Sequence, residues 1–113
     1  MNLLWEMPLK IAKGGGDMPH GMTGAIAIVF AGAASHEEAL WKGVTAVREM
    51  NYIFEDVTGG RVLQIAVEDW DEYASNKWPE FAANLPSGSD VPAIVSSGQV
   101  FFGPFLGYQD AQN

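Results

Sequence analysis

Apolar residues are continuous over one stretch of the chain and periodic over the stretch that follows it. Residues 25–31 are all apolar, which is typical of a strand covered on both faces, as in parallel sheets. Ser35 and Glu38 then have the spacing of a capping box, in which the hydroxyl accepts from the third helical N–H and the carboxylate reaches back. The pattern predicts a buried central strand that leads into a helix.

Apolar positions from Ser35 onward recur at spacings of three and four residues. This period continues to Val57 and predicts one helix of about six turns, closed by Gly59 and Gly60. Residues 61–69 carry another nearly continuous apolar run and predict a second strand beside the first. A strand, a helix and a strand in this order predict a right-handed crossover.

The later part of the chain predicts shorter elements. Residues 71–84 have a helical pattern that Pro79 interrupts, so two short helical pieces are expected. Residues 91–95 and 99–102 favour strands, and only three residues separate them. A connection this short predicts an antiparallel hairpin.

The chain of 113 residues has the length of one domain. Residues 1–24 predict an arm with a short strand followed by a glycine-rich loop, because three consecutive glycines and a proline disfavour regular structure. Residues 25–108 are expected to form the folded domain. Residues 109–113 are polar and are expected to fray.

The order of these elements, a strand, a helix, a strand, a helix and a hairpin, resembles the thioredoxin-like superfamily. The resemblance covers residues 25–108. It implies an α/β fold with a mixed central βαβαββ sheet and helices packed on it. The chain has no sequence left for the terminal helix of that fold, so one sheet face is expected to be bare.

Two motifs carry most of this resemblance. Residues 30–38 are similar to the strand and turn in which a Cys-x-x-Cys motif opens the long helix. On this alignment Ser35 and Glu38 stand at the two cysteine positions. Residues 91–93, Val-Pro-Ala, are similar to the element whose cis proline faces that motif.

The chain contains no cysteine, and this limits what the resemblance implies. Disulfide exchange needs a thiolate, so the expected role is a redox-inactive module that binds or scaffolds protein, without catalysis or cofactor. A cis Pro92 would expose the backbone of Val91 to an extended peptide or to glutathione, while a trans proline at a strand start is the alternative. Ser35, His36, Val91 and Pro92 are therefore predicted binding residues, and a cysteine-free glutathione-binding enzyme is an alternative function.

Other chemistry is weaker in the sequence. Ser35, His36 and either Glu37 or Glu38 suggest a hydrolase, but adjacent helical residues point about 100° apart, so Ser35 and His36 cannot form a nucleophile–base pair. The acids at 68–72 lack the glycine-turn pattern of a hard-cation site. Neither a catalytic residue nor a metal site is predicted.

Composition and charge indicate an acidic globular protein. The formal net charge is −8, from 14 acidic and 6 basic side chains, which argues against direct nucleic-acid binding. Glu6 interrupts the apolar start of the chain, so no signal peptide is predicted, and no apolar run is long enough to span a membrane. The expected location is the cytoplasm.

The acidic residues are unevenly distributed along the chain. Residues 55–90 contain eight acids against Arg61 and Lys77, and aromatic residues beside charge are favoured in protein interfaces. Trp70 is the predicted contact residue in this region. The bare sheet face favours a homo-oligomer or another protein partner. A small acidic inhibitor that occupies the basic site of a nucleic-acid enzyme, as small phage proteins do, is the alternative.

Overall fold

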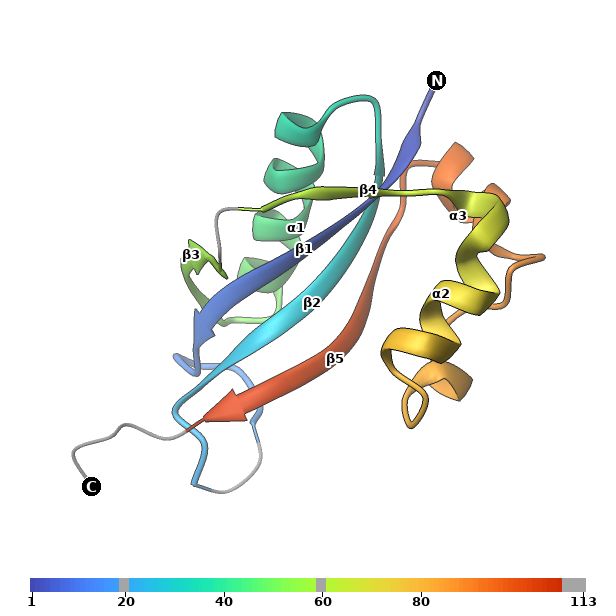
Figure 1. The fold of residues 1–113 in the computed structure, drawn as a ribbon. Helices are drawn as coiled ribbons and strands as arrows, with labels where there is room; N and C mark the ends of the chain where they lie inside the picture. Colours follow the sequence, from blue (N-terminus) through green and yellow to red (C-terminus); the bar gives the residue numbers. More distant parts are fainter. Residues whose placement is uncertain (19–20, 59–60, 109–113) are drawn as a thin grey trace.

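The structure is a computed structural model that describes residues 1–18, 21–58 and 61–108. A five-stranded sheet runs through the middle of the molecule, with helices on both sides (Figure 1). The elements in chain order are β1 (Leu3–Ala12), β2 (Gly24–Ala33), α1 (His36–Glu49), β3 (Ile53–Val57), β4 (Leu63–Ile65), η2 (Val67–Asp69), α2 (Trp70–Lys77), η3 (Ala82–Asn84), α3 (Val91–Ser96) and β5 (Val100–Tyr108).

Neighbouring strands of this sheet are antiparallel. The strand order is β3-β1-β2-β5. β4 lies outside this order and pairs with residues 4–6 of β1, whereas β3 pairs with residues 9–12 of β1. β1 pairs with β2 over ten residues, from Leu3 opposite Ala33 to Ala12 opposite Gly24. The expectation of an N-terminal arm outside the domain is therefore wrong, because β1 is an inner strand with partners on both edges.

The continuous apolar run of β2 is explained by cover on both faces rather than by parallel pairing. β2 is an inner strand whose odd positions face α1 and whose even positions face the α2 and α3 side. The sequence predicts a strand beside β2 at residues 61–69. The strand found there, β4, has only three residues and pairs with β1 and not with β2. The helix does connect β2 to a strand, β3, that runs in the same direction, but β1 lies between the two strands.

The long predicted helix is α1 followed by β3. The capping box is confirmed, because Ser35 Oγ accepts from Glu38 N–H at 3.2 Å and Glu38 Oε1 accepts from Ala34 N–H at 2.7 Å. Asn51 has a left-handed backbone with φ 70°, so the helix stops before it and the chain turns into β3. Apolar residues after position 51 fit either period, and pairing with β1 selects the strand. The predicted closing glycines at 59–60 lie outside the described residues, as does the predicted frayed end at 109–113.

The predicted interruption at Pro79 is confirmed, with α2 before it and η3 after it. The hairpin over 91–102 is wrong, because residues 91–96 form α3. Pro92 lies in the first turn of this helix, where the missing N–H and the fixed φ of proline are tolerated. Val91 and Val95 are four residues apart and bury one side of α3. β5 follows alone and is longer than the predicted strand.

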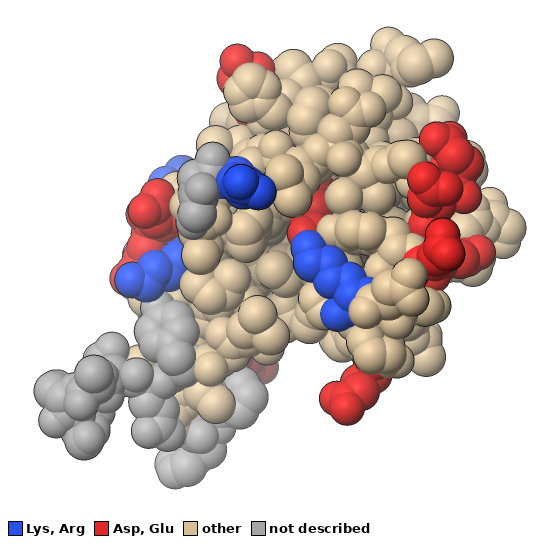
Figure 2. Space-filling model, viewed as in Figure 1, with Lys and Arg blue, Asp and Glu red and all other residues tan. Residues whose placement is uncertain are grey.

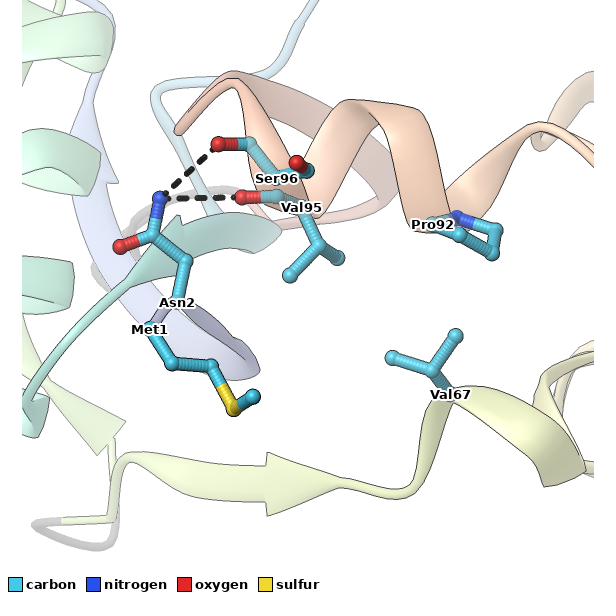
Figure 3. Close-up of a pocket in the computed structure, with 6 residues that line it drawn as sticks. All are labelled: Met1, Asn2, Val67, Pro92, Val95 and Ser96. Carbon is cyan, nitrogen blue, oxygen red and sulfur yellow. Dashed lines mark hydrogen bonds between the residues drawn. The ribbon is translucent and has the colours of Figure 1, made fainter.

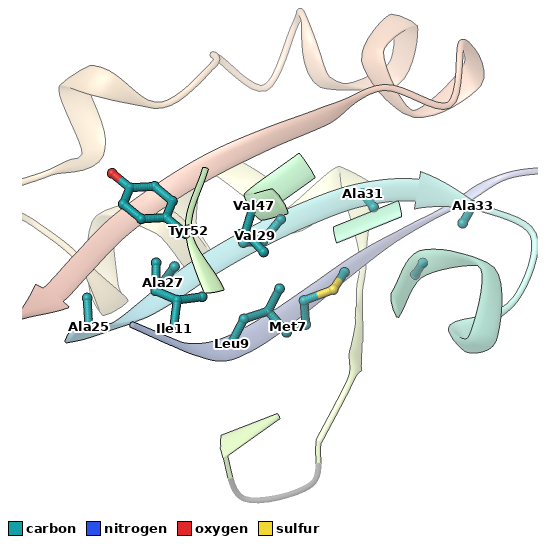
Figure 4. Packing of buried hydrophobic residues seen from close by; sticks show 11 residues of the cluster. Met7, Leu9, Ile11, Ala25, Ala27, Val29, Ala31, Ala33, Val47 and Tyr52 are labelled. Carbon is teal, nitrogen blue, oxygen red and sulfur yellow. The ribbon is translucent and has the colours of Figure 1, made fainter. Parts of the chain in front are cut away.

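Two apolar clusters lie on opposite faces of the sheet. The α1 side is shown in Figure 4. Its buried members are Met7, Leu9, Ile11, Ala25, Ala27, Val29, Ala31, Ala33, Ala39, Val47 and Tyr52. The cluster beneath α2 and α3 contains Leu4, Ile28, Phe30, Ile65, Trp70, Ala74, Leu85, Val91 and Val95.

The helices on the α2 side cover only part of their sheet face. The cross-strand row Glu6, Phe30 and Phe101 lies beneath α2, and Glu6 and Phe30 are buried. Further along the same face, Ile26 of β2 lies between Lys10 of β1 and Leu106 of β5. Lys10 and Leu106 are exposed. Among the described residues, one end of this face is therefore open, whereas the expectation that a whole sheet face is bare is wrong, because α2 and α3 pack on it.

Candidate functional site

The predicted binding residues do not form one site. Ser35 and His36 lie at the start of α1 on one face of the sheet, whereas Val91 and Pro92 lie at the start of α3 on the other face. None of the peptide bonds of the described residues is cis. The arrangement that suggested a thioredoxin-like binding site is thus not found, and kinship with that superfamily stays a prediction.

Val91 offers no strand edge to a peptide. Its side chain is completely buried, and the backbone of α3 forms internal helical bonds. Pro92 is exposed and lines a shallow pocket of about 560 Å³ (Figure 3). Across this pocket Asn2 Nδ2 donates to the carbonyls of Val95 and Ser96 at 3.1 and 3.4 Å, which closes the end of α3. The described residues that line the pocket have no titratable side chain.

Ser35 and His36 have local structural roles. The hydroxyl of Ser35 is held in the cap of α1. The exposed imidazole of His36 lies 3.4 Å from Glu37 Oε1 and packs near Trp5, with ring centroids 6.3 Å apart. No hydrogen bond joins Ser35 to His36 in the described part of the chain, so the two side chains are not arranged as a nucleophile and its base.

The prediction of Trp70 as a contact residue is wrong. Its side chain is 1% exposed, packs edge-on against Phe30 and donates through Nε1 to the Pro86 carbonyl at 2.8 Å. Trp41 on α1, by contrast, is 67% exposed. Helical periodicity does not show which of the two tryptophans is buried. Trp70 is buried because its side of α2 packs on the sheet, whereas Trp41 lies on a side of α1 that faces away from it.

A buried ionic cluster lies between β1 and α2. Glu6 is 3% exposed, and its Oε2 is 2.7 Å from Lys77 Nζ. Its Oε1 accepts from the Tyr73 hydroxyl at 2.5 Å, and Lys77 also donates to that hydroxyl at 3.0 Å. The ammonium lies over the rings of Tyr73 and Trp78, 5.3 and 4.9 Å from their centroids, a cation–π geometry.

Sequence reasoning used Glu6 only to exclude a signal peptide. The sequence signal for it is an acid among the apolar residues 3–9, because a carboxylate is buried only when it is paired. Its partners are about 70 residues away along the chain, so the pairing could not be predicted.

The pKa shifts in this cluster argue against acid–base catalysis near neutral pH. Burial, and then the hydrogen bond to Glu6, raises the pKa of Tyr73 above its ordinary value. Burial alone would lower the pKa of Lys77, but the bonds to Glu6 and Tyr73 outweigh it and the pKa is raised. Both protons are therefore held more tightly, whereas a general base needs a pKa near the working pH.

Two open grooves meet at Lys77. One, of about 490 Å³, is lined by Asp69, Glu72, Tyr73, Asn76 and Lys77. The other, of about 450 Å³, is mostly apolar and lies between the end of α2 and β5; its lining residues are Lys77, Trp78, Pro79, Glu80, Phe81, Pro104 and Leu106. We call the two together the α2 groove.

Negative charge gathers on the same side of the molecule (Figure 2). Residues 67–96, which contain α2 and α3, carry six acids and one lysine. All six acids are exposed, and the lysine is Lys77. No group of three or more potential metal ligands occurs among the residues that the structure describes.

We found no match to this chain among protein-family models, curated proteins or solved structures. Within the described ranges, none of the helices has both the length and the apolar character that crossing a membrane requires.

Proposed function

We propose that this protein is a non-catalytic module that binds a protein partner through its α2 side. The observation that carries the proposal is the separation of charge: residues 67–96 account for −5 of the formal net charge of −8. Their only cation, Lys77, points inward to Glu6. The surface is therefore negative without internal compensation, which steers and orients a basic partner.

The absence of cysteine supports a binding role without redox chemistry, since thiolate exchange is impossible. The polar groups with shifted pKa values support it as well. Tyr73 and Lys77 hold their protons, and both belong to a cluster that fastens α2 to the sheet. That arrangement serves the stability of the fold rather than proton transfer.

A second candidate function is an acidic inhibitor that occupies the basic site of a nucleic-acid enzyme. The same charged layer favours it, because closely spaced carboxylates on α2 imitate the negative charge of a nucleic-acid backbone. In this case the partner's nucleic acid and this protein compete for one site. A scaffold that binds elsewhere leaves nucleic-acid binding unchanged.

The test compares two charge reversals of equal size. Glu68→Lys/Glu72→Lys changes the α2 side, and Glu37→Lys/Glu49→Lys changes α1; all four side chains are exposed. Proteins retained by each immobilised variant are quantified by mass spectrometry against the unmodified chain. We expect partners to be lost only with the α2 variant.

Equal retention by both variants, or loss with both, would overturn the proposal. Circular dichroism of the two variants controls for folding. Competition between a retained partner's nucleic acid and this protein then separates the inhibitor from the scaffold.

A further inference from the structure

The α2 groove combines an acidic half and an apolar half. Asp69 and Glu72 line the first half, while Trp78, Phe81 and Leu106 contribute to the second. Figure 2 shows acidic side chains gathered on the α2 side of this face. A ligand that fills both halves must satisfy both kinds of surface.

The apolar half continues onto the open end of the sheet. Leu106 of β5 is 55% exposed and pairs with Ile26 of β2, which is only partly buried. Trp78 and Phe81 are also only partly buried. Their exposed parts lie beside Pro104 and Leu106 in one groove, so an apolar side chain placed there removes water from several surfaces at once.

The cation within the groove does not neutralise its acids. Lys77 Nζ is committed to Glu6 and the Tyr73 hydroxyl and is packed over two rings. Asp69, Glu72 and Glu80 have no ion-pair partner in the described ranges. A cation brought by a partner therefore meets unpaired carboxylates, which is favourable before any apolar contact forms.

Charge also discriminates between occupants. A second copy of this chain carries the same net charge of −8 and the same acidic border, so two α2 grooves facing each other would repel. A nucleic acid is excluded for the same reason. The occupant that complements both halves is a protein segment with a basic residue and large apolar residues.

The length of α2 sets the distance between the acidic and the apolar half of the groove. Glu72 on α2 and Trp78, the residue directly after α2, are six positions apart, which is about 9 Å at the rise of a helix. An extended chain covers that distance in about three residues. The basic residue of the segment thus lies about three positions from the apolar ones.

We propose that the α2 groove binds a segment of a partner protein in which Arg or Lys stands about three residues from a pair of large apolar residues. The basic side chain lies at Asp69 and Glu72, and the apolar side chains lie on Trp78, Phe81 and Leu106. This inference rests on the proposed function and names its partner more closely.

The test uses synthetic pentapeptides and the whole isotope-labelled chain in nuclear magnetic resonance titrations. The probe is Arg-Ser-Ser-Leu-Trp. Gln-Ser-Ser-Leu-Trp removes the charge of its arginine side chain, and Glu-Ser-Ser-Leu-Trp reverses that charge. Arg-Ser-Ser-Ser-Gln keeps the arginine and removes the apolar pair. We expect saturable shifts at Lys77, Trp78, Phe81 and Leu106 with the first probe. The Gln probe is expected to bind about threefold to tenfold more weakly, the range of one or two exposed charge pairs.

Matched variants locate the two halves. Asp69→Asn/Glu72→Gln should reduce the affinity for the Arg probe to that for the Gln probe and leave the latter unchanged. Leu106→Ser should weaken both, whereas Ile53→Ser, at an equally exposed apolar position on the opposite edge strand β3 (54% against 55%), should weaken neither.

Shifts outside the groove, equal affinity for the Arg and Glu probes, or no shift at millimolar peptide would overturn the inference. So would a dimer in sedimentation that Leu106→Ser dissociates, because the occupant would then be a second copy. If the α2 charge reversal still removes partners while the probes fail, protein binding by the α2 side stands and only the segment is wrong.

Discussion

Lys77 Nζ on α2 and Glu6 Oε2 on β1 are 2.7 Å apart, and the glutamate side chain is 3% exposed while the lysine side chain is 42% exposed. The pair therefore has one partner inside the protein and one at its border. Among the described residues, Lys77 and Tyr73 are the hydrogen-bond partners that replace water at this carboxylate. This ion pair adds a polar contact to the apolar packing of Trp70 on Phe30 that also holds α2 on the sheet, and it lies at the edge of the α2 groove.

Replacing Lys77 with Met is expected to lower the free energy of unfolding by about 2 kcal/mol, because it leaves a buried carboxylate without its cation. The value lies below that of a fully buried pair since Lys77 is partly exposed. Urea unfolding followed by circular dichroism measures it.

Two variants control this experiment. Lys10→Met removes an exposed ion pair to Glu55 whose atoms are 3.8 Å apart, and we expect a loss of under about 0.5 kcal/mol. Glu6→Gln/Lys77→Met should recover part of the loss, because no charge is then buried. An equal effect of the two lysine variants would contradict the assigned role of Glu6.

Alkaline pH is expected to destabilise the protein. Burial is the first cause of the raised pKa values of Tyr73 and Tyr52, and the bonds to Glu6 and Tyr73 raise the pKa of Lys77. A group whose pKa is higher in the folded state contributes stability that is complete below its unfolded pKa and is lost as the pH rises through its folded pKa. The free energy of unfolding should therefore fall above about pH 10.

Urea unfolding at a series of alkaline pH values measures this dependence. Tyr73→Phe and Tyr52→Phe remove one titrating group each, and each should make the fall less steep. A free energy of unfolding that stays constant through this range would show that these groups titrate alike in the folded and unfolded chain.

Gly32→Ala is expected to destabilise the protein by about 1–3 kcal/mol, the usual cost of overpacking. A Cβ at Gly32 would lie 2.6 Å from the Val95 carbonyl oxygen and 2.8 Å from Val95 Cα. These are backbone atoms of α3, so the helix has to move away from β2. Thermal unfolding compares this variant with Gly15→Ala, whose Cβ would meet no atom closer than 3.5 Å; the second variant should stay near the parent.

Ser35→Ala is expected to cost about 1 kcal/mol, because the Glu38 N–H then loses its side-chain acceptor. Ser75→Ala, at an exposed position inside α2, is the matched control and should change stability by less than about 0.5 kcal/mol. Chemical denaturation of both variants gives the difference. Equal values would mean that the hydroxyl of Ser35 adds nothing beyond that of a surface serine.

Local features were predictable because they depend on neighbours along the chain. The seven apolar residues 25–31 specify a strand covered on both faces, Ser35 and Glu38 specify the start of a helix, and Pro79 ends one. The absence of thiol chemistry and the concentration of acids also follow from composition alone.

Pairing across the sheet was decided only by the tertiary structure. The apolar residues between 53 and 57 fit a helix period as well as a strand, and contact with β1 makes them β3. Residues 91–96 have strand-like side chains, yet burial of Val91 and Val95 on the sheet selects a helix. Periodicity reports which residues avoid water but not which surface covers them.

The candidate site shows the same division. The acidic character of residues 67–96 follows from composition. The burial of Trp70, the pairing of Glu6 with Lys77 and the groove beside Leu106 form only when β1, α2 and β5 come together. Contacts between residues about 70 positions apart depend on the whole fold, because chain entropy opposes each of them until the others have formed.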